Sequence, residues 1–185
     1  MVPMLCDAAD SLLVLIDLQP GLAEAMPVKE WERTRHNCLT LLTAAQVLSV
    51  PVLLTEQHPP NLGATFPEIS TRLPPGTRPL SKASFSCIGA EGFTARLQQS
   101  GRTQVILAGQ EAHVSVLQTA IALLALGFSV FVVEDAVVSR HPEHKLYALE
   151  RMRQAGAVVL PGESVLFEWL GSAHHPRFKE LVSLL

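Results

Sequence analysis

The sequence has few cysteines, no excess of basic residues and no long run of apolar residues. Its three cysteines, Cys6, Cys38 and Cys87, are too widely spaced for a zinc motif or a disulfide framework, which favours a reducing, cytoplasmic setting. With 14 lysines and arginines against 17 aspartates and glutamates, the formal net charge is −3, so neither nucleic acid nor a membrane surface is an expected partner. The longest apolar run, residues 120–126, is too short to span a bilayer, and residues 1–10 lack the pattern of a signal peptide.

Several motifs of catalytic or metal-binding sites are also missing. None of the seven histidines belongs to an H-E-x-x-H motif or a D-x-H pair, so we expect no metal ion and no other cofactor. Most histidines are expected on loops or on the surface; these are His58, His113, His141, His144, His174 and His175. The residues around Ser115 read His-Val-Ser-Val-Leu, which excludes the G-x-S-x-G nucleophile elbow.

The composition is that of a compact globular chain. Of the 185 residues, 48% are hydrophobic and 17% are charged, which excludes the low-hydrophobicity composition of disordered chains. This length predicts a single domain over residues 1–185 with a sizeable buried core.

Short runs rich in Val, Ile and Leu alternate with helix-like stretches. The runs do not alternate between apolar and polar residues, as is typical of strands that are buried on both faces. The predicted strands are Leu12–Ile16, Pro51–Thr55, Thr103–Ala108, Phe128–Glu134 and Ala157–Leu160. Such an alternation predicts a three-layer α/β fold, Rossmann-like and doubly wound, with a mainly parallel sheet.

Two further segments stand out between the predicted strands. Apolar residues at spacings of three and four predict a helix over about Val28–Leu48. Residues 56–81 contain six of the 13 prolines without a sustained period, so we expect a long loop there. Long ordered loops in compact domains are often functional.

In a doubly wound sheet, ligands bind beyond the carboxyl ends of the strands, and polar residues gather at these ends. Asp17 directly follows the first predicted strand. Burial there could raise the pKa of its carboxyl into the range of a general base. Capping of the next turn by the Asp17 side chain is an equally good interpretation. Lys82 follows the proline-rich segment and could stabilise a developing anion beside Asp17, but its spacing alone favours a surface lysine.

Ser115 follows the strand end at Gly109 and is expected in or near the first turn of a helix. Free backbone N–H groups at that end can stabilise an anion. Ser115 with Gln118 also fits the S-x-x-Q capping box, and taken alone this capping role is the better interpretation.

At these residues the chain resembles the isochorismatase-like hydrolases, also called cysteine hydrolases, over nearly its whole length. The tail stretches at 150–157 and 175–180 resemble the isochorismatase-domain-containing subgroup in particular. The other supporting stretches lie, in order, at 13–19, 53–59, 62–65, 81–86, 109–120 and 132–140.

The resemblance implies an Asp-Lys-Cys site in which the aspartate accepts the thiol proton and the thiolate attacks a carbonyl carbon. Asp17 and Lys82 match the first two residues, but Ser115 stands where the family has the cysteine. The backbone N–H groups of Glu111, Val114 and Ser115 would form the oxyanion hole, after a cis peptide near Gln110–Glu111. The Asp-x-His metal site of nicotinamidases does not carry over, because the sequence at 56–58 reads Glu-Gln-His.

The resemblance also implies a small-molecule substrate and a homo-oligomer, a dimer or larger. Substrate contacts are expected from four further side chains, Gln19, Phe66, Phe85 and His113. The apolar tail Leu181–Leu185 could be part of an oligomer contact.

The serine raises the main functional question. A thiol can be converted to thiolate by a nearby cation and a helix N-terminus, whereas an alcohol needs a base during the attack. Four explanations are open: an introduced serine, a serine-dependent hydrolase, cysteine-independent vinyl-ether hydrolysis through Asp17, or a noncatalytic binding or scaffold protein. Cys87, five residues after Lys82, is a weak candidate for a replacement nucleophile.

Overall fold

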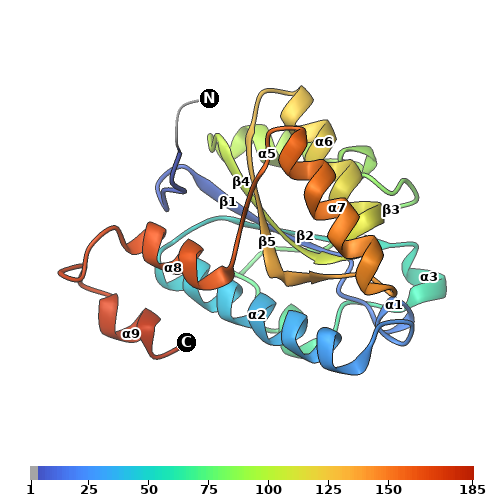
Figure 1. Cartoon of the computed structure of the whole chain (residues 1–185), viewed down its shortest axis with the longest axis horizontal. Coiled ribbons are helices and arrows are strands. Elements are labelled where there is room, and N and C mark those ends of the chain that lie inside the picture. Colours follow the sequence, from blue (N-terminus) through green and yellow to red (C-terminus); the bar gives the residue numbers. More distant parts are fainter. Residues whose placement is uncertain (1–3) are drawn as a thin grey trace.

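A computed structural model describes residues 4–185, which form a three-layer α/β fold (Figure 1). Residues 1–3 lie outside the described residues. They belong to the expected domain and to residues 1–10, in which the sequence showed no signal-peptide pattern. The parallel sheet has the order β3-β2-β1-β4-β5-β6 and confirms the predicted fold class. Its strands are β1 (Ser11–Ile16), β2 (Val52–Gln57), β3 (Leu80–Lys82), β4 (Gln104–Gln110), β5 (Ser129–Val138) and β6 (Val158–Leu160).

Helices cover both faces of the sheet. One face carries α2, α8 and α9, and the other carries α5, α6 and α7 (Figure 1). The helices are α1 (Pro20–Ala23), α2 (Val28–Val47), α3 (Pro59–Leu62), α4 (Pro67–Ser70), α5 (Phe93–Gln99), α6 (Leu117–Ala125), α7 (Pro142–Gln154), α8 (Gly162–Leu170) and α9 (Phe178–Val182). A 3-10 helix spans Cys87–Gly89, and a π-helical turn spans Ala112–Val116. None of the helices of residues 4–185 is long and apolar enough to cross a membrane.

Strand β1 is buried on both faces and divides the core in two. Leu13 and Leu15 pack toward α2 and α8, whereas Leu12, Val14 and Ile16 pack toward α5 and α6. The continuous apolar run therefore predicted a central strand correctly.

The prediction of a loop over residues 56–81 was wrong at both ends and in its middle. Strand β2 continues to Gln57, the segment contains the short helices α3 and α4, and β3 begins at Leu80. Prolines begin both helices, because proline suits the first helical turn, where its missing N–H costs no hydrogen bond. The prediction also ended the fourth run, Phe128–Glu134, too early, because β5 extends to Val138 past an irregularity in its register with β4.

Gly109 lets β4 approach β1 closely just before the strand end. Its φ is +121°, and a Cβ atom there would lie 2.1 Å from the carbonyl oxygen of Ile16. An L side chain meets both an unfavourable backbone conformation and a backbone clash at this position.

We predict that Gly109→Ala lowers the free energy of unfolding by about 3 kcal/mol or more, because backbone strain and overpacking add. Gly127→Ala is the matched control, since Gly127 also has a positive φ of +87° but no atom within 4 Å of an added Cβ. The control should cost only about 1–2 kcal/mol. Urea denaturation measures both, and equal losses would contradict the role given to the close approach.

Candidate active site

Asp17 and Ser115 meet beyond the carboxyl ends of β1 and β4. These neighbouring strands are where the strand order reverses, the place at which open α/β sheets bind ligands. Asp17 directly follows β1, and Ser115 lies in the π-helical turn after β4. Lys82 ends β3 and reaches the same place from the edge of the sheet.

A buried ion pair joins Asp17 and Lys82. Lys82 Nζ donates to Asp17 Oδ2 over 2.7 Å, and both side chains are fully buried. The other carboxylate oxygen, Oδ1, accepts a hydrogen bond of 2.8 Å from the Thr55 hydroxyl. Lys82 is therefore not the surface lysine that its spacing alone favoured.

The Lys82 ammonium group lies among more acceptors than its three N–H donors can serve. Besides Asp17, its nearest acceptors are Gln57 Oε1 at 2.6 Å and the Phe85 carbonyl at 3.0 Å. Ser115 Oγ lies 3.2 Å from Nζ, within hydrogen-bond range. The lysine thus links the carboxylate and the serine hydroxyl of the site.

Burial raises the pKa of the Asp17 carboxyl above its ordinary value. The charge of Lys82 and the hydrogen bonds from Lys82, Thr55 and Ser115 act in the opposite direction. A carboxyl with a raised pKa exchanges protons more readily near neutral pH, as a general acid or base requires.

The backbone of Asp17 is held in an unusual conformation. Its φ is +53°, in the left-handed region that residues other than glycine rarely adopt. The Gln110 side chain donates to the Asp17 carbonyl over 2.9 Å, and the Asp17 N–H donates to the Thr55 carbonyl over 3.1 Å. Such conformations persist where the surrounding structure fixes them, which is common at functional sites.

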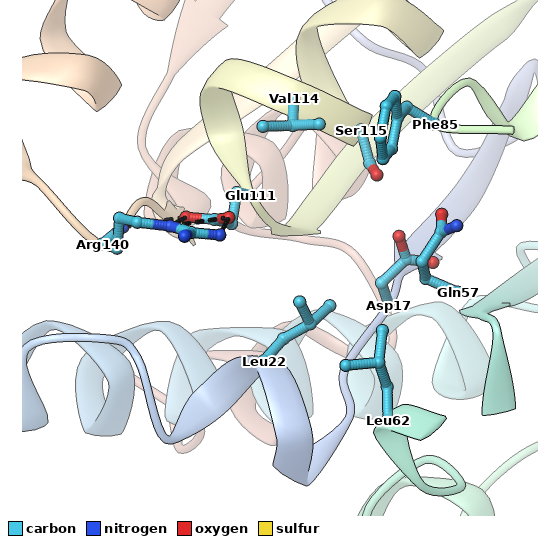
Figure 2. A pocket seen from close by; sticks show the side chains of 9 residues that line it. All are labelled: Asp17, Leu22, Gln57, Leu62, Phe85, Glu111, Val114, Ser115 and Arg140. Carbon is cyan, nitrogen blue, oxygen red and sulfur yellow. Dashed lines mark hydrogen bonds and ion pairs between the residues drawn. The ribbon is translucent and has the colours of Figure 1, made fainter. Parts of the chain in front are cut away.

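A cavity of about 250 Å³ opens beside Asp17 and Ser115 (Figure 2). Its lining residues are Asp17, Leu22, Gln57, Leu62, Phe85, Glu111, Val114, Ser115 and Arg140. Gly21 allows α1 to pack closely on α3, which brings Leu22 and Leu62 together at one wall. The volume is below the range of about 300–1,000 Å³ typical of pockets for drug-sized ligands, so the cavity suits a small molecule.

The turn that carries Ser115 begins after a cis peptide bond between Gln110 and Glu111, where the resemblance implied it. The Ser115 side chain does not cap α6, because that helix starts at Leu117 and has no side-chain cap. The Val114 N–H donates to the Glu111 carbonyl over 3.1 Å, so this oxyanion-hole candidate is engaged within the turn.

Two expected substrate contacts line no part of this cavity. The Phe66 ring packs on Trp31, with 5.5 Å between ring centroids, and belongs to the core beside α2. The His113 ring lies against His144 of α7, with 4.8 Å between ring centroids, and its Nδ1 lies 2.9 Å from the Ser139 hydroxyl.

Two other expected residues act close to the cavity. Gln19 is fully buried and, like Phe66 and His113, does not line the cavity. It braces the cavity wall through hydrogen bonds to the Gln57 and Gly63 backbones. Phe85 lines the cavity, as expected of a substrate contact, and is 53% exposed.

The segments around Cys87 and around residues 56–58 supply neither a replacement nucleophile nor a cluster of metal ligands. Cys87 is fully buried, and its Sγ lies 3.6 Å from the Thr55 hydroxyl, behind the cavity wall; burial raises the pKa of its thiol to about 11. Glu56 accepts two hydrogen bonds from Thr65, and His58 is exposed. Within residues 4–185 no three metal-binding side chains come together.

Sequence reasoning missed Arg140, which lines the cavity. Arg140 lies two residues beyond β5, whose end at Val138 the prediction placed at Glu134. Glu134 and Asp135, at the end of the predicted strand Phe128–Glu134, do not line this cavity. The Asp135 carboxylate accepts a hydrogen bond from the Gly162 N–H. Arg140 does belong to the stretch at 132–140 that carries the resemblance, and this was the available signal.

The parallel sheet with helices on both faces is the α/β fold of the isochorismatase-like hydrolases, and the pair of Asp17 and Lys82 lies where its strand order reverses. The family model "Isochorismatase domain" matches residues 11–164. Isochorismatase domain-containing protein 2 of Bos taurus is 42% identical over 177 residues, which cover 95% of this chain and 82% of that protein. The chain belongs to the isochorismatase domain family.

Two solved structures resemble the whole chain. The MAR1 ribonuclease of Caenorhabditis elegans is 36% identical with a TM-score of 0.91, covering 98% of this chain and 92% of that one. The YcaC gene product of Escherichia coli, described as an octameric hydrolase of unknown specificity, is 25% identical with a TM-score of 0.85, covering 99% and 97% of the two chains.

We predict that Lys82→Met lowers the free energy of unfolding by about 3–5 kcal/mol at pH 8, because the variant leaves Asp17 buried and unpaired. Without Lys82 the pKa of Asp17 rises further, so the folded variant binds a proton that the unfolded chain releases. Stability from this proton is present at low pH and lost as pH rises, so the deficit should be smaller at pH 5 than at pH 8.

Urea denaturation of the protein and the variant at both pH values measures this difference. The control is Asp17→Asn with Lys82→Met, which removes the titrating carboxyl and should lose the pH dependence. A deficit that is equal at pH 5 and pH 8 would contradict the buried pair.

Proposed function

We propose that this chain is a hydrolase that cleaves a C–N bond, or a related C–O bond, of a small molecule. The observation that carries the proposal is the placement of the Ser115 hydroxyl at a cavity, within hydrogen-bond range of a Lys82 that is paired with a buried Asp17. This arrangement supplies a nucleophile, a proton acceptor and a fixed positive charge.

In the proposed reaction the Ser115 oxygen attacks the carbonyl carbon of an amide while its proton passes to Asp17. The oxyanion that forms is stabilised by backbone N–H groups of the turn at Glu111 and Ser115. Asp17 then protonates the leaving amine, and water releases the acyl group from Ser115 with Asp17 again accepting a proton. Asp17 finally returns this proton to the Ser115 oxygen, which restores the starting enzyme. Lys82 stabilises the Asp17 carboxylate while it is ionised, before the attack and again after the leaving amine has been protonated.

A second candidate reaction needs no nucleophile. The raised pKa of Asp17 also suits a general acid that protonates a vinyl ether, which water then hydrolyses. The noncatalytic alternative is a protein that uses the same cavity only to bind a ligand or partner.

The Caenorhabditis elegans neighbour has the name of a ribonuclease. The net charge of −3 and the small cavity favour a small-molecule substrate for this chain over RNA. The three free cysteines, all buried, support the proposal of a reducing cytoplasmic location.

We predict turnover of at least one member of a panel of small amides and vinyl ethers, measured as ammonia release or product formation. Asp17→Asn should lower the rate by 100-fold or more in either reaction, since proton transfer contributes about 10²–10⁴. Ser115→Ala separates the reactions, because it removes the nucleophile of amide cleavage and leaves protonation of a vinyl ether intact. A panel without turnover would favour the binding protein.

A readout that needs no substrate follows from the same site. Ser115→Cys should give a thiol with a pKa below 8.5, because the Lys82 ammonium lies beside it. The alkylation rate against pH reports this pKa. The unchanged protein corrects for Cys6, Cys38 and Cys87, which are buried and whose thiol pKa values burial raises. An ordinary thiol pKa would mean that the pocket does not activate this position.

We also propose that the chain forms a homo-oligomer, as the Escherichia coli neighbour does. The expected contact through the tail is weakened by the structure, because Leu181 is fully buried in the chain's own core. Exposed apolar side chains on α6, directly after it and on α7 are better candidates, namely Ile121, Leu126, Leu146 and Tyr147. Light scattering should give a multiple of the 20.1 kDa chain mass, and the monomer mass would contradict the proposal.

A further inference from the structure

The cavity has two polar ends with apolar walls between them. Asp17, Gln57 and Ser115 form one end, and Glu111 with Arg140 forms the other (Figure 2). The apolar side chains of Leu22 and Val114 lie between these two ends in this view. A ligand that fills the cavity therefore meets hydrogen-bonding groups at both of its ends.

Arg140 is held in place by Glu111. Its Nη2 and Nε atoms donate to the Glu111 carboxylate over 2.6 Å and 3.1 Å, and its backbone N–H donates to the same group over 3.0 Å. Burial opposes ionisation of Glu111, but the hydrogen bonds and charge of Arg140 outweigh it and lower the pKa of the carboxyl. The guanidinium plane is thus fixed by a charged partner that is 4% exposed.

Part of the guanidinium group is left for a ligand. A guanidinium carries five N–H donors, and Glu111 takes those on one edge. Arg140 Nη1 has no hydrogen-bond partner among residues 4–185, and the side chain is 50% exposed at the cavity. The arginine can therefore donate to an acceptor atom inside the cavity without releasing Glu111.

The formal charges of the site favour an uncharged ligand. Lys82 balances Asp17, and Arg140 balances Glu111, so the two pairs together have no net charge. A ligand carboxylate would lose its hydration without gaining an unbalanced positive charge, whereas an amide or ketone oxygen loses far less.

We propose that Arg140 is a specificity residue that donates a hydrogen bond to an uncharged oxygen acceptor at the far end of the substrate. The substrate is then a neutral molecule with two polar ends, one carbonyl placed at Ser115 and a second acceptor at Arg140. This inference rests on the proposed hydrolase function for the identity of the reacting end.

The test measures binding without turnover. Ser115→Ala is titrated calorimetrically with the diamides malonamide, succinamide and glutaramide, which differ in length. Each diamide is compared with the monoamide of equal chain length, propionamide, butyramide or valeramide, and with its half-amide carboxylate. We expect one diamide to bind more tightly than both its monoamide and its half-amide carboxylate.

Arg140→Met in the same background should raise the Kd of that diamide about tenfold to a hundredfold and leave the Kd of the monoamide within about twofold. Arg33→Met is the matched control, because Arg33 is also half-exposed and paired with a glutamate, at a surface away from the cavity. Because Arg140→Met leaves Glu111 buried and unpaired, Glu111→Gln with Arg140→Met is measured as well. This double variant should show the same loss.

Three results would overturn the inference: no diamide binds, the half-amide carboxylate binds more tightly than the diamide, or the double variant retains diamide affinity. Turnover by the protein with Ser115 in place is assayed in parallel. Binding that depends on Arg140 without turnover would overturn only the proposed hydrolase function. Turnover with a KM that is independent of Arg140 would overturn only the specificity role.

Discussion

The buried pair of Asp17 and Lys82 is the interaction on which the rest of the site depends. Two charges removed from water cost several kcal/mol each, and their attraction offsets this cost only if the remaining hydrogen-bonding groups are also satisfied. Thr55 serves the carboxylate, and Gln57 with the Phe85 carbonyl serves the ammonium group. The strand ends of β2 and the segment after β3 are therefore fixed by the same pair that gives the site its chemistry.

The strand order explains how residues so far apart in sequence meet. Strands β1 and β4 are neighbours, which places Asp17 beside the turn of Ser115, while β3 at the sheet edge brings Lys82 in from the other side. Gly109 permits the close approach of β4 to β1, and the Gln110 side chain holds the Asp17 backbone from the next position along the chain. The strand order thus brings the side chains of the site together, and a few backbone contacts fix the orientation of Asp17.

The sequence predicted what local patterns encode and missed what depends on tertiary contacts. Continuous apolar runs predicted the buried strands, and the strand ends placed Asp17 and Ser115 correctly at one edge. Lys82 could be placed beside them only by the resemblance, because β3 is three residues long and pairs with β2 alone. Arg140 escaped notice because the register irregularity that lengthens β5 has no local sequence pattern. Phe66 was misplaced because an aromatic residue after a loop packs in the core as readily as at a site.

The serine at position 115 changes which part of the site does the chemical work. A thiolate is formed before it attacks, so a cysteine site depends on the positive charge of the lysine. An alcohol keeps its proton until the attack, so a serine site depends on the proton affinity of the carboxyl. Burial raises the pKa of Asp17, and this increases that affinity, whereas Lys82 decreases it. The same pair that would activate a thiol therefore restrains the base that an alcohol needs, and the balance between burial and ion pairing sets how well Ser115 can act.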